Sequence, residues 1–261
     1  MRLDVFLVKK DFFSSRELAK TNIKRGNVWV NGVISTKPSL EVCEDVSIAL
    51  KTENIIPYVS RGGLKLEKAL KEFEISCKDY DVLDIGASTG GFTDCVLKHG
   101  ARRVFAVDVG TGQLSPTLKN DQRVISIENI HIKDLTSNHL NSVLFHLIVA
   151  DLSFISLTKV LEFLPKFLLP IGKAIVLIKP QFEVGTNLIG KGGIVKNSKA
   201  HEMAIANVFN AALKNGLSLS KITRSPIQDD RKNVEFLALL EQNPMDERKL
   251  ESFIKLALNK Q

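Results

Sequence analysis

The chain has little of what metal, disulfide and membrane proteins depend on. It contains three cysteines, Cys43, Cys77 and Cys95, and five histidines, and none of them forms a C-x-x-C or H-E-x-x-H motif. Widely separated cysteines in odd number are typical of reduced cytoplasmic thiols, and unclustered histidines predict no metal site. No apolar run approaches the ~20 residues that span a bilayer, and the N-terminus lacks a signal-peptide pattern. We therefore expect a cytoplasmic protein with no metal and no membrane partner.

Acidic residues are in the minority, 29 against 36 lysines and arginines, and the formal net charge is +7. This excess is compatible with a polyanionic partner, although charge by itself does not establish one. The chain of 261 residues is 44% apolar and 25% charged, as ordinary globular proteins are. It is long enough for one large domain and a second, small one.

A glycine-rich turn between an apolar run and a helical pattern lies at residues 81–93, DVLDIGASTGGFT. Strand, glycine turn and helix open a nucleotide-binding βαβ unit. The spacing Asp84-x-Gly86-x-x-x-Gly90-Gly91 differs from the dinucleotide fingerprint, which disfavours a nicotinamide dehydrogenase. Glycine lets the backbone approach a ligand closely. The acid indicates a ligand with positive charge, and S-adenosylmethionine fits because it carries an ammonium and a sulfonium.

A second acid supports this interpretation. Asp108 ends the next apolar run and lies 18 residues after Gly90, where such folds hold the ribose hydroxyls of a nucleotide. Glu128 and Asn129 follow a third short run, 124–127, at a place where an adenine contact is often found. The structural alternative is a tight turn followed by a helix N-cap, without a ligand.

Residues 1–50 have the pattern of a small basic module. Apolar side chains at helical spacing predict two short helices, with Ser14 or Ser15 as N-cap of the second. Two strands around an Asn31-Gly32 turn follow, and then a strand at 46–50. Six basic residues lie between positions 9 and 25 against two acids: Lys9, Lys10, Arg16, Lys20, Lys24 and Arg25. Such a face is typical of phosphate-backbone binding, and a merely solvated helical face is the alternative.

The junction after this module is polar and interrupted by a proline, so we expect a linker at 51–59. Ser60 can cap a helix that runs through Phe73. Lys65 lies between two leucines in this helix and need not face solvent, although most helical lysines do.

The rest of the chain alternates between strand-like and helix-like patterns. Apolar runs predict strands at 144–150, 174–178, 218–224 and 234–240, and periodic stretches predict helices at 157–168, 198–215 and 246–258. This alternation indicates a mainly parallel sheet covered on both faces, in which ligands lie beyond the carboxyl ends of the strands. Five polar side chains are expected at those ends: Asp84, Asp108, Glu128, Asp151 and Lys179.

Methyl transfer from a sulfonium needs a positioned, partly deprotonated nucleophile. A ribose 2′-hydroxyl is a weak nucleophile, and a lysine can act as its base only where burial or a nearby cation lowers the lysine pKa. Two lysines held by carboxylates meet that need. Ordinary structural roles are the alternatives for Lys179, at a strand end, and for Glu235, in an alternating strand. Ser153 lacks the histidine spacing of a hydrolase triad.

Four groups of residues in the first 50 form a recognisable pattern: Arg2-Leu3-Asp4; Ser15-Arg16-x-x-Ala19; Ile23-x-x-Gly26-x-Val28-x-Val30-Asn31-Gly32; and Lys37-Pro38-Ser39. In these residues the region resembles the S-four RNA-binding domain, a small module of a ribosomal protein and of many pseudouridine synthases. The resemblance implies a small α+β domain that docks on structured RNA by shape and phosphate contacts rather than by base reading.

Six further motifs follow: SRGGLKL at 60–66, DIGASTGGF at 84–92, VDVG at 107–110, ADLSF at 150–154, IKPQFE at 178–183 and NVEF at 233–236. In these motifs the chain resembles the FtsJ-like ribose 2′-O-methyltransferases, and as a whole it is similar to the TlyA family, often labelled hemolysin. The resemblance implies an α/β, Rossmann-like class I methyltransferase domain at 60–261, after an RNA-binding domain at 1–50 and a linker at 51–59.

The Lys-Asp-Lys-Glu tetrad of this family carries over to Lys65, Asp151, Lys179 and Glu235. The resemblance implies that Lys179 is the base-like residue at the 2′-hydroxyl. It also implies that Lys65 and Asp151 set its charge state and position, and that Glu235 orients the ribose. Lys65 is taken rather than Lys68 because Lys65 completes the Ser-Arg-Gly-Gly-x-Lys-Leu pattern.

The implied cofactor is S-adenosylmethionine, with expected contacts from Asp84, Gly86, Ala87, Ser88, Gly90, Gly91, Phe92, Asp108, Glu128, Asn129 and Asp151. RNA contacts are expected from the six N-terminal basic residues and from Arg61 and Lys191. The implied reaction is 2′-O-methylation of a cytidine in ribosomal RNA, and the short start before Arg2 favours large-subunit RNA. The sequence does not indicate the oligomeric state.

Two other functions stay open. The first is a ribosome-assembly factor that binds RNA but has lost activity, and the intact tetrad and glycine turn argue against it. The second is the membrane-active protein that the hemolysin label suggests. No transmembrane pattern or Trp-rich amphipathic helix supports that function.

Overall fold

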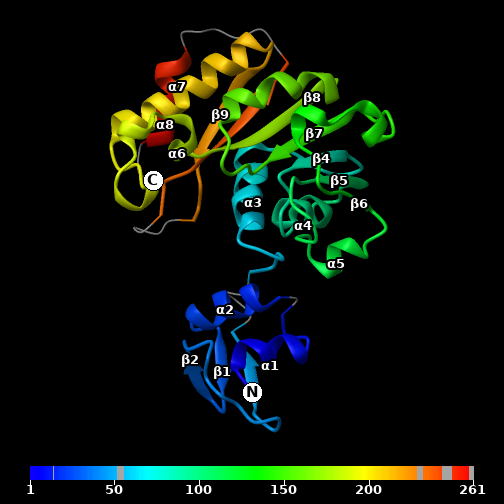
Figure 1. Ribbon diagram of the computed structural model, residues 1–261, viewed down its shortest axis with the longest axis vertical. Helices are drawn as coiled ribbons and strands as arrows, with labels where there is room; N and C mark the ends of the chain where they lie inside the picture. The colour runs from blue at the N-terminus through cyan, green and yellow to red at the C-terminus, as the bar shows by residue number, and fades with distance from the viewer. Residues whose placement is uncertain (14, 52–55, 228–231, 243–248, 259–261) are drawn as a thin grey trace.

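The computed structural model describes residues 1–13, 15–51, 56–227, 232–242 and 249–258. Figure 1 shows a small N-terminal part, drawn in blue, below a larger part that contains the rest of the chain. Two predicted features, a helix cap at Ser14 and a helix start at residue 246, fall outside the described residues.

The N-terminal part combines two helices with a three-stranded antiparallel sheet. Its elements are α1 (Leu3–Lys9), α2 (Arg16–Lys24), β1 (Val28–Val30), β2 (Val33–Ser35) and β3 (Ile48–Leu50), in the strand order β2-β1-β3. The Ser15 side chain accepts a hydrogen bond from the backbone N–H of Leu18 and caps α2. Asn31 and Gly32 both have positive φ, 50° and 79°, which the tight turn between β1 and β2 requires.

The larger part is built on a seven-stranded sheet in the order β6-β5-β4-β7-β8-β10-β9. The strands are β4 (Asp81–Ile85), β5 (Arg103–Val107), β6 (Val124–Ile127), β7 (Phe145–Ala150), β8 (Leu168–Ile178), β9 (Ser218–Arg224) and β10 (Phe236–Glu241). The pairs among β4 to β8 are parallel, and β10 is antiparallel to both of its neighbours. The predicted α/β class with a mainly parallel sheet is therefore confirmed.

The strand order reverses between β4 and β7, which lie side by side although residues 86–144 separate them in the chain. At such a switch point the loops after the two strands diverge to opposite faces and leave a crevice. Asp84 and the glycine turn belong to β4 and the loop after it, and Asp151 directly follows β7. The fold therefore brings two predicted site segments to one edge of the sheet.

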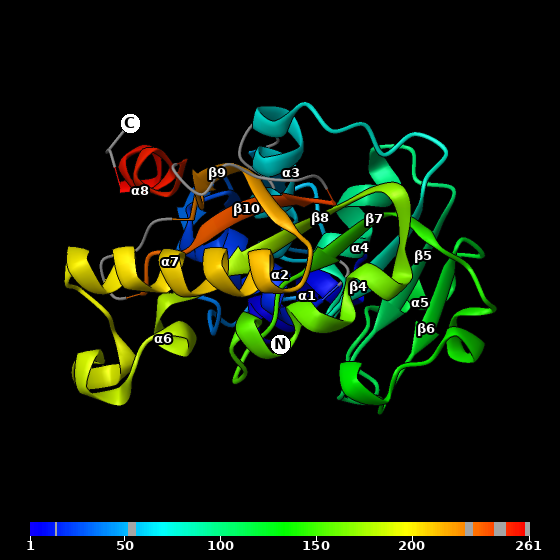
Figure 2. The ribbon, with the colours of Figure 1, turned by 90° about the horizontal axis from the view of Figure 1, so that it is seen from above.

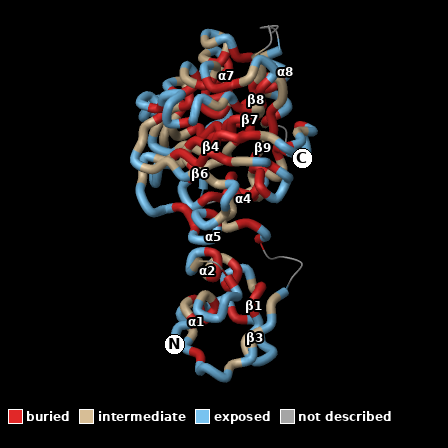
Figure 3. Tube along the Cα trace, turned by 90° about the vertical axis from the view of Figure 1, so that its right-hand side faces the viewer, coloured by how far each residue is buried: buried red, intermediate tan, exposed pale blue. Residues whose placement is uncertain are grey.

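Helices cover both faces of the large sheet. They are α3 (Gly62–Phe73), α4 (Gly91–Lys98), α5 (Pro116–Lys119), α6 (Pro180–Glu183), α7 (Ser198–Lys214) and α8 (Leu250–Leu258). Alternate residues of each strand belong to different cores: Val82 packs with α3 and α4, whereas Leu83 packs with α7 and α8. Figure 2 shows α3 and α7 on opposite sides of β8 and β10, and Figure 3 shows that the strands between them are buried.

Short 3₁₀ turns connect these elements: η2 (Ile132–Asp134), η3 (Ser137–Leu140), η4 (Leu157–Lys159), η5 (Leu161–Phe163), η6 (Pro165–Phe167), η7 (Thr186–Leu188) and η8 (Lys191–Gly193). The prediction of one helix over 157–168 was wrong, because η4 to η6 occupy this stretch. Pro165 has no N–H to donate to the carbonyl four residues earlier, so an α-helix cannot continue through it. Within the described ranges, no helix has the length and hydropathy of a membrane span.

Some predicted boundaries also differ from the structure. The strand expected from residue 174 begins at Leu168, where a register shift in its pairing with β7 accommodates Pro170 and Gly172. The strand expected from residue 234 begins at Phe236. Arg61 rather than Ser60 occupies the cap position of α3, and the Ser60 hydroxyl accepts a 3.3 Å hydrogen bond from Gly62 N–H.

Candidate active site

A cavity of about 540 Å³ opens at the carboxyl ends of β4, β7 and β8. Its wall includes the start of α3, the glycine turn after β4 and the segments that follow β7 and β8. Residues 192, 194, 232, 233 and 235 close the side next to β10. This is the location at which open parallel sheets bind ligands.

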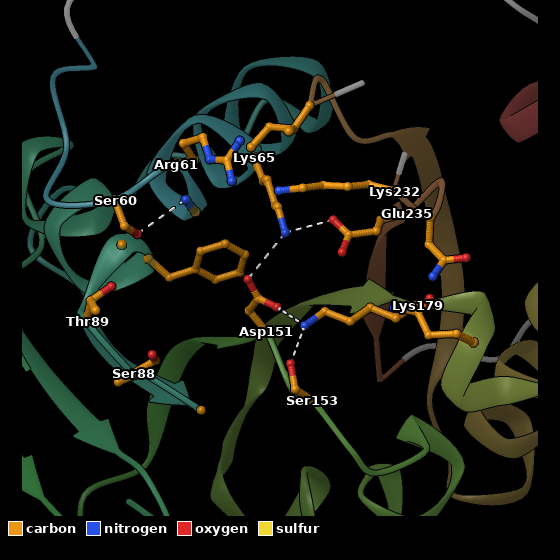
Figure 4. Close-up of a pocket in the computed structure, with 18 of the residues that line it drawn as sticks. Ser60, Arg61, Lys65, Ser88, Thr89, Asp151, Ser153, Lys179, Lys232 and Glu235 are labelled. Carbon is orange, nitrogen blue, oxygen red and sulfur yellow. Dashed lines mark hydrogen bonds and ion pairs between the residues drawn. The ribbon is translucent and has the colours of Figure 1, made fainter. Parts of the chain in front are cut away.

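Four charged side chains form a continuous network across this cavity (Figure 4). Lys179 Nζ lies 2.7 Å from Asp151 Oδ1, and Lys65 Nζ lies 3.6 Å from Asp151 Oδ2 and 2.7 Å from Glu235 Oε2. Their side chains are 9% to 21% exposed. Charges at this depth need partners because burial removes their hydration. The four residues predicted as the tetrad are therefore linked in one chain of contacts.

Each member of the network comes from a different element. Lys65 lies in the first turn of α3, and Asp151 directly follows β7. Lys179 ends β8 and is the N-cap residue of α6, where Pro180 fits the first helical position. Glu235 precedes β10. Asp151 is the shared centre, because its two oxygens contact the two lysines.

Lys179 has a second partner, since its ammonium donates a 2.8 Å hydrogen bond to Ser153 Oγ. The contact with Asp151 is an ion pair without the angles of a directed hydrogen bond. Asp151 and Ser153 therefore hold the ammonium from two sides. From the sequence, Ser153 was discussed only as a possible nucleophile. A serine that accepts a hydrogen bond from a lysine has no characteristic sequence spacing, so the sequence could not predict this contact.

Asp84 lies in β4, two residues before cavity residue Gly86, and is completely buried. Its Oδ2 accepts a 2.6 Å hydrogen bond from Thr93 Oγ1, whereas its Oδ1 has no hydrogen-bond partner among the described residues. Burial, with a smaller contribution from the Asp151 charge, raises the pKa of Asp84 from 3.8 to about 7. A cationic group near this carboxylate would compensate its charge, which fits the ligand class expected from the sequence.

The glycines of the turn are required by their surroundings. Gly86 has a φ of +82°, and a Cβ there would lie 2.9 Å from Leu152 Cδ2 and 3.1 Å from the Asp151 carbonyl. A Cβ at Gly90 would lie 2.2 Å from Leu118 Cδ1. A side chain at either position would clash with these neighbours. Glycine therefore lets the backbone of the turn pass close to them.

The other predicted cofactor contacts divide into two groups. Gly86, Ala87, Ser88, Gly91, Phe92 and Asp151 line the cavity, and Asp84, Gly90, Asp108, Glu128 and Asn129 do not. Asp108 accepts hydrogen bonds from the N–H groups of Ser88 and Gly110, both at 2.7 Å. Glu128 accepts one from Gly112 N–H at 3.0 Å. The two acids therefore hold the loops after β4 and β5 in place.

The predicted RNA contacts lie apart from this network. Lys9 and Lys20 pair with exposed Glu44 and Glu17, and Lys10 lies over the Phe6 ring. Arg16 lies 2.9 Å from buried Asp4, and hydrogen bonds from Arg2 and then Arg16 lower the pKa of Asp4 to about 2. Arg16 therefore also supports the fold of the module.

A cleft of about 970 Å³ along α3 is lined by two of the predicted RNA contacts, Arg25 and Arg61. Arg61 also lines the first cavity. Lys24 and Lys191 are exposed, and Lys191 lies in η8 next to cavity residue Gly192.

Asn233 was not among the predicted site residues. Its Oδ1 accepts a 2.7 Å hydrogen bond from Val195 N–H, and its Nδ2 donates a 2.8 Å hydrogen bond to the Gly193 carbonyl. These bonds connect the glycine-rich segment to Asn233, which lies two positions before Glu235. The NVEF motif contained Asn233, but its partners are some 40 residues away in the sequence, so only the fold identifies the contact.

Comparisons with known proteins match both parts of the chain. Residues 58–242 match the FtsJ-like methyltransferase family, and residues 1–48 match the S4 domain. "Hemolysin A" of Brachyspira hyodysenteriae is 42% identical over 91% of this chain and 98% of its own length. "16S/23S rRNA (cytidine-2'-O)-methyltransferase TlyA" of Mycobacterium tuberculosis is 37% identical over 92% and 89%.

A third relative, "23S rRNA (cytidine-2'-O)-methyltransferase TlyA" of Campylobacter jejuni, is 35% identical over 90% of this chain and 97% of its own length. The solved structure of a protein from Streptococcus thermophilus, described as a hemolysin, superimposes with a TM-score of 0.76 at 41% identity and covers 97% of this chain and 94% of that chain. Both the sequence and the fold are thus shared along nearly the whole length. This chain belongs to the TlyA family of FtsJ-like methyltransferases with an N-terminal S4 domain.

Proposed function

We propose that the protein transfers a methyl group from S-adenosylmethionine to the ribose 2′-hydroxyl of a cytidine in ribosomal RNA. The convergence of Lys65, Asp151, Lys179 and Glu235 in one cavity carries the proposal. The activities named for the mycobacterial and Campylobacter relatives support it. Large-subunit RNA is the favoured substrate, because the Campylobacter relative, matched over 97% of its length, is named for 23S RNA alone.

The residues of the cavity fit S-adenosylmethionine. Bound there, it supplies a methyl group on a positively charged sulfur, which a nucleophile can displace. The open turn from Gly86 to Phe92 would hold it, and the unpartnered oxygen of Asp84 suits a cationic ligand. Asp108 would hold ribose hydroxyls, and Glu128 with Asn129 would contact the adenine.

Lys179 acts as the base in this proposal. It would take the proton of the 2′-hydroxyl while the 2′-oxygen forms a bond to the methyl carbon. The bond from that carbon to the sulfur would break at the same time, and the sulfur would leave as a neutral thioether. Only a neutral amine can accept a proton, so Lys179 must first lose the proton of its ammonium. Asp151 also contacts Lys65, so its negative charge does not stabilise the Lys179 ammonium alone. Asp151 and Ser153 restrict the orientation of the Lys179 amine, so that its free direction faces the cavity.

Lys65 and Glu235 complete the arrangement. Lys65 contacts both carboxylates, and its charge compensates their mutual repulsion. Glu235 has one oxygen, Oε2, on Lys65 and would orient the substrate ribose by accepting a hydrogen bond. The network thus supplies a base and a fixed ribose position, the two requirements of an in-line displacement.

The N-terminal part supplies RNA affinity in this proposal. Residues 1–50 would form the RNA-binding domain, 51–59 the linker and 60–261 the methyltransferase domain. The basic residues of α2 and the Arg25–Arg61 cleft would position ribosomal RNA toward the cavity. The protein would act in the cytoplasm on a ribosomal subunit.

Mapping of 2′-O-methyl groups on ribosomal RNA from cells with and without this protein tests the function. At least one cytidine methyl should disappear in its absence and return when the wild-type chain is supplied. If every 2′-O-methyl persists, and the purified protein binds ribosomal subunits without modifying them, the ribosome-assembly factor is the better description.

A further inference from the structure

A second cavity of about 250 Å³ adjoins the catalytic one. The two share a wall made by Ile194, Ile227, Lys232, Asn233 and Glu235. On its far side the second cavity is lined by residues around Lys196, His201 and Arg224. Glu235 therefore lies between the catalytic cavity and a space that the proposed chemistry does not use.

The wall of this second cavity is rich in positive charge. Lys196, Arg224 and Lys232 line it, and Glu235 is the one acid among the described residues of the wall. The Glu235 carboxylate is already paired with Lys65 at 2.7 Å. Among the described residues of the wall, Lys196 and Arg224 are left beside this pair, and a concave surface with an excess of cations attracts anions.

Arg224 is the most informative of these cations. It ends β9 and is half-buried, and its backbone carbonyl accepts a 2.9 Å hydrogen bond from Lys68 Nζ. Its guanidinium makes no hydrogen bond or ion pair with the part of the chain that the structure describes. Partial burial of a cation without an acid is unfavourable, and an anion with paired oxygens suits the fork of an arginine.

The wall that carries Lys196 is held in place by buried contacts. His201 is 8% exposed, and its Nε2 is hydrogen-bonded to the Val195 carbonyl at 2.9 Å. Asn233 accepts a hydrogen bond from the N–H of the same Val195. The residue before Lys196 is thus fixed from both of its backbone polar groups, and the cavity is a built feature of the fold.

We propose that this second cavity binds a backbone phosphate of the RNA next to the target ribose, with Arg224 and Lys196 as its main ligands. The inference rests on the proposed function. In RNA the carbon beside the 2′-carbon carries a phosphodiester, so a ribose at Lys179 and Glu235 brings a phosphate close to the shared wall. A phosphate there fixes the position of the ribose without reading a base.

The experiment compares Arg224→Gln, Arg224→Lys and Lys196→Ala with the wild type, using ribosomal subunits from cells that lack the protein. Arg224→Gln should raise the dissociation constant for RNA about tenfold, as expected when a charged hydrogen bond is lost. The slope of its logarithm against log salt should fall by about 0.7 to 0.9. Arg224→Lys should retain most of the slope because it keeps the charge.

Lys214→Ala is the matched control, because Lys214 is an exposed lysine at the end of α7 and does not line the cavity. If Arg224→Gln and Lys196→Ala bind RNA with the affinity and salt slope of Lys214→Ala, the phosphate site is refuted. A loss of S-adenosylmethionine affinity in calorimetry, with RNA affinity unchanged, would assign the cavity to the cofactor carboxylate and also refute it.

Failure of the proposed function has a different signature. A wild-type protein that binds subunits but methylates no ribosomal RNA contradicts the methyltransferase proposal, whereas RNA affinity and salt slope still report on Arg224. Thermal unfolding identifies a variant that does not fold, and Arg224→Lys and Lys196→Ala then decide the question.

Discussion

The two parts of the protein use charge in opposite ways. In the N-terminal part six basic residues lie within 17 positions of one another and most of them are exposed. Lys9 and Lys20 pair there with the exposed acids Glu44 and Glu17. In the catalytic part, four charges from positions 65 to 235 meet in a cavity and are mostly buried. Exposed ion pairs contribute little to stability, whereas each buried charge depends on its partners.

This difference indicates a division of labour. An exposed basic face attracts a polyanion at long range and tolerates the loss of one residue. A buried network positions single protons and fails when one member is removed. We therefore expect substitutions in the N-terminal part to change RNA affinity, and substitutions in the tetrad to change the rate of methyl transfer.

The largest effect is expected from Lys179→Ala. Without a base at the 2′-hydroxyl, the rate at saturating substrates should fall by about a thousandfold, while binding of RNA and of S-adenosylmethionine persists. Transfer of a radiolabelled methyl group to ribosomal subunits, with calorimetry for the cofactor, measures both. Lys173→Ala is the control, because Lys173 lies on the same strand and pairs at the surface with Glu241. A Lys179→Ala variant as active as the wild type would contradict the assignment of Lys179 as the base.

A pH-dependent effect on stability is expected from Asp84→Asn. Burial raises the pKa of Asp84 from 3.8 to about 7, so the folded state holds this proton more tightly than the unfolded state. Protonation therefore stabilises the fold at low pH, and this contribution is lost as pH rises from about 4 through about 7. Asparagine cannot ionise, so the variant should gain on the order of 2 kcal/mol more at pH 8 than at pH 5.

Urea unfolding of the cofactor-free protein at the two pH values measures this difference. Asp45→Asn in the N-terminal part is the control, because Asp45 is exposed and its substitution should have the same small effect at both pH values. If the effect of Asp84→Asn on stability is the same at both pH values, the pKa of the Asp84 carboxyl is not raised by burial. The variant should also bind S-adenosylmethionine more weakly above pH 7, where the wild-type carboxylate is charged.

The smallest effect is expected from the double charge reversal Lys20→Glu with Lys24→Glu on α2. RNA affinity should fall on the order of tenfold, and more steeply at low salt, because two phosphate contacts become repulsive. The rate at saturating RNA should be unchanged. The same double change at exposed Lys119 and Lys133 of the catalytic part is the control. Equal losses in the two double variants would show that net charge alone governs RNA binding.

The sequence determined the features that depend on neighbouring residues. The glycine turn after β4, the Ser15 cap and the Asn31-Gly32 hairpin were all predicted, because each is specified within a few positions. The tetrad was also named from its motifs, although nothing in its spacing shows that Lys65 contacts Glu235. Local periodicity failed at 157–168, where Pro165 and the packing of three short turns replaced a helix.

The tertiary structure alone decided which distant groups share an environment. Ser153 on Lys179, the Asn233 bridge to residues 193–195, and the cations around Arg224 each join segments that are far apart or carry no motif of their own. Side-chain burial and contact depend on how strands are ordered in the sheet, and the reversal between β4 and β7 is set by packing of the whole chain. Chain-local chemistry therefore identifies the residue types of the site, and the fold assigns their partners.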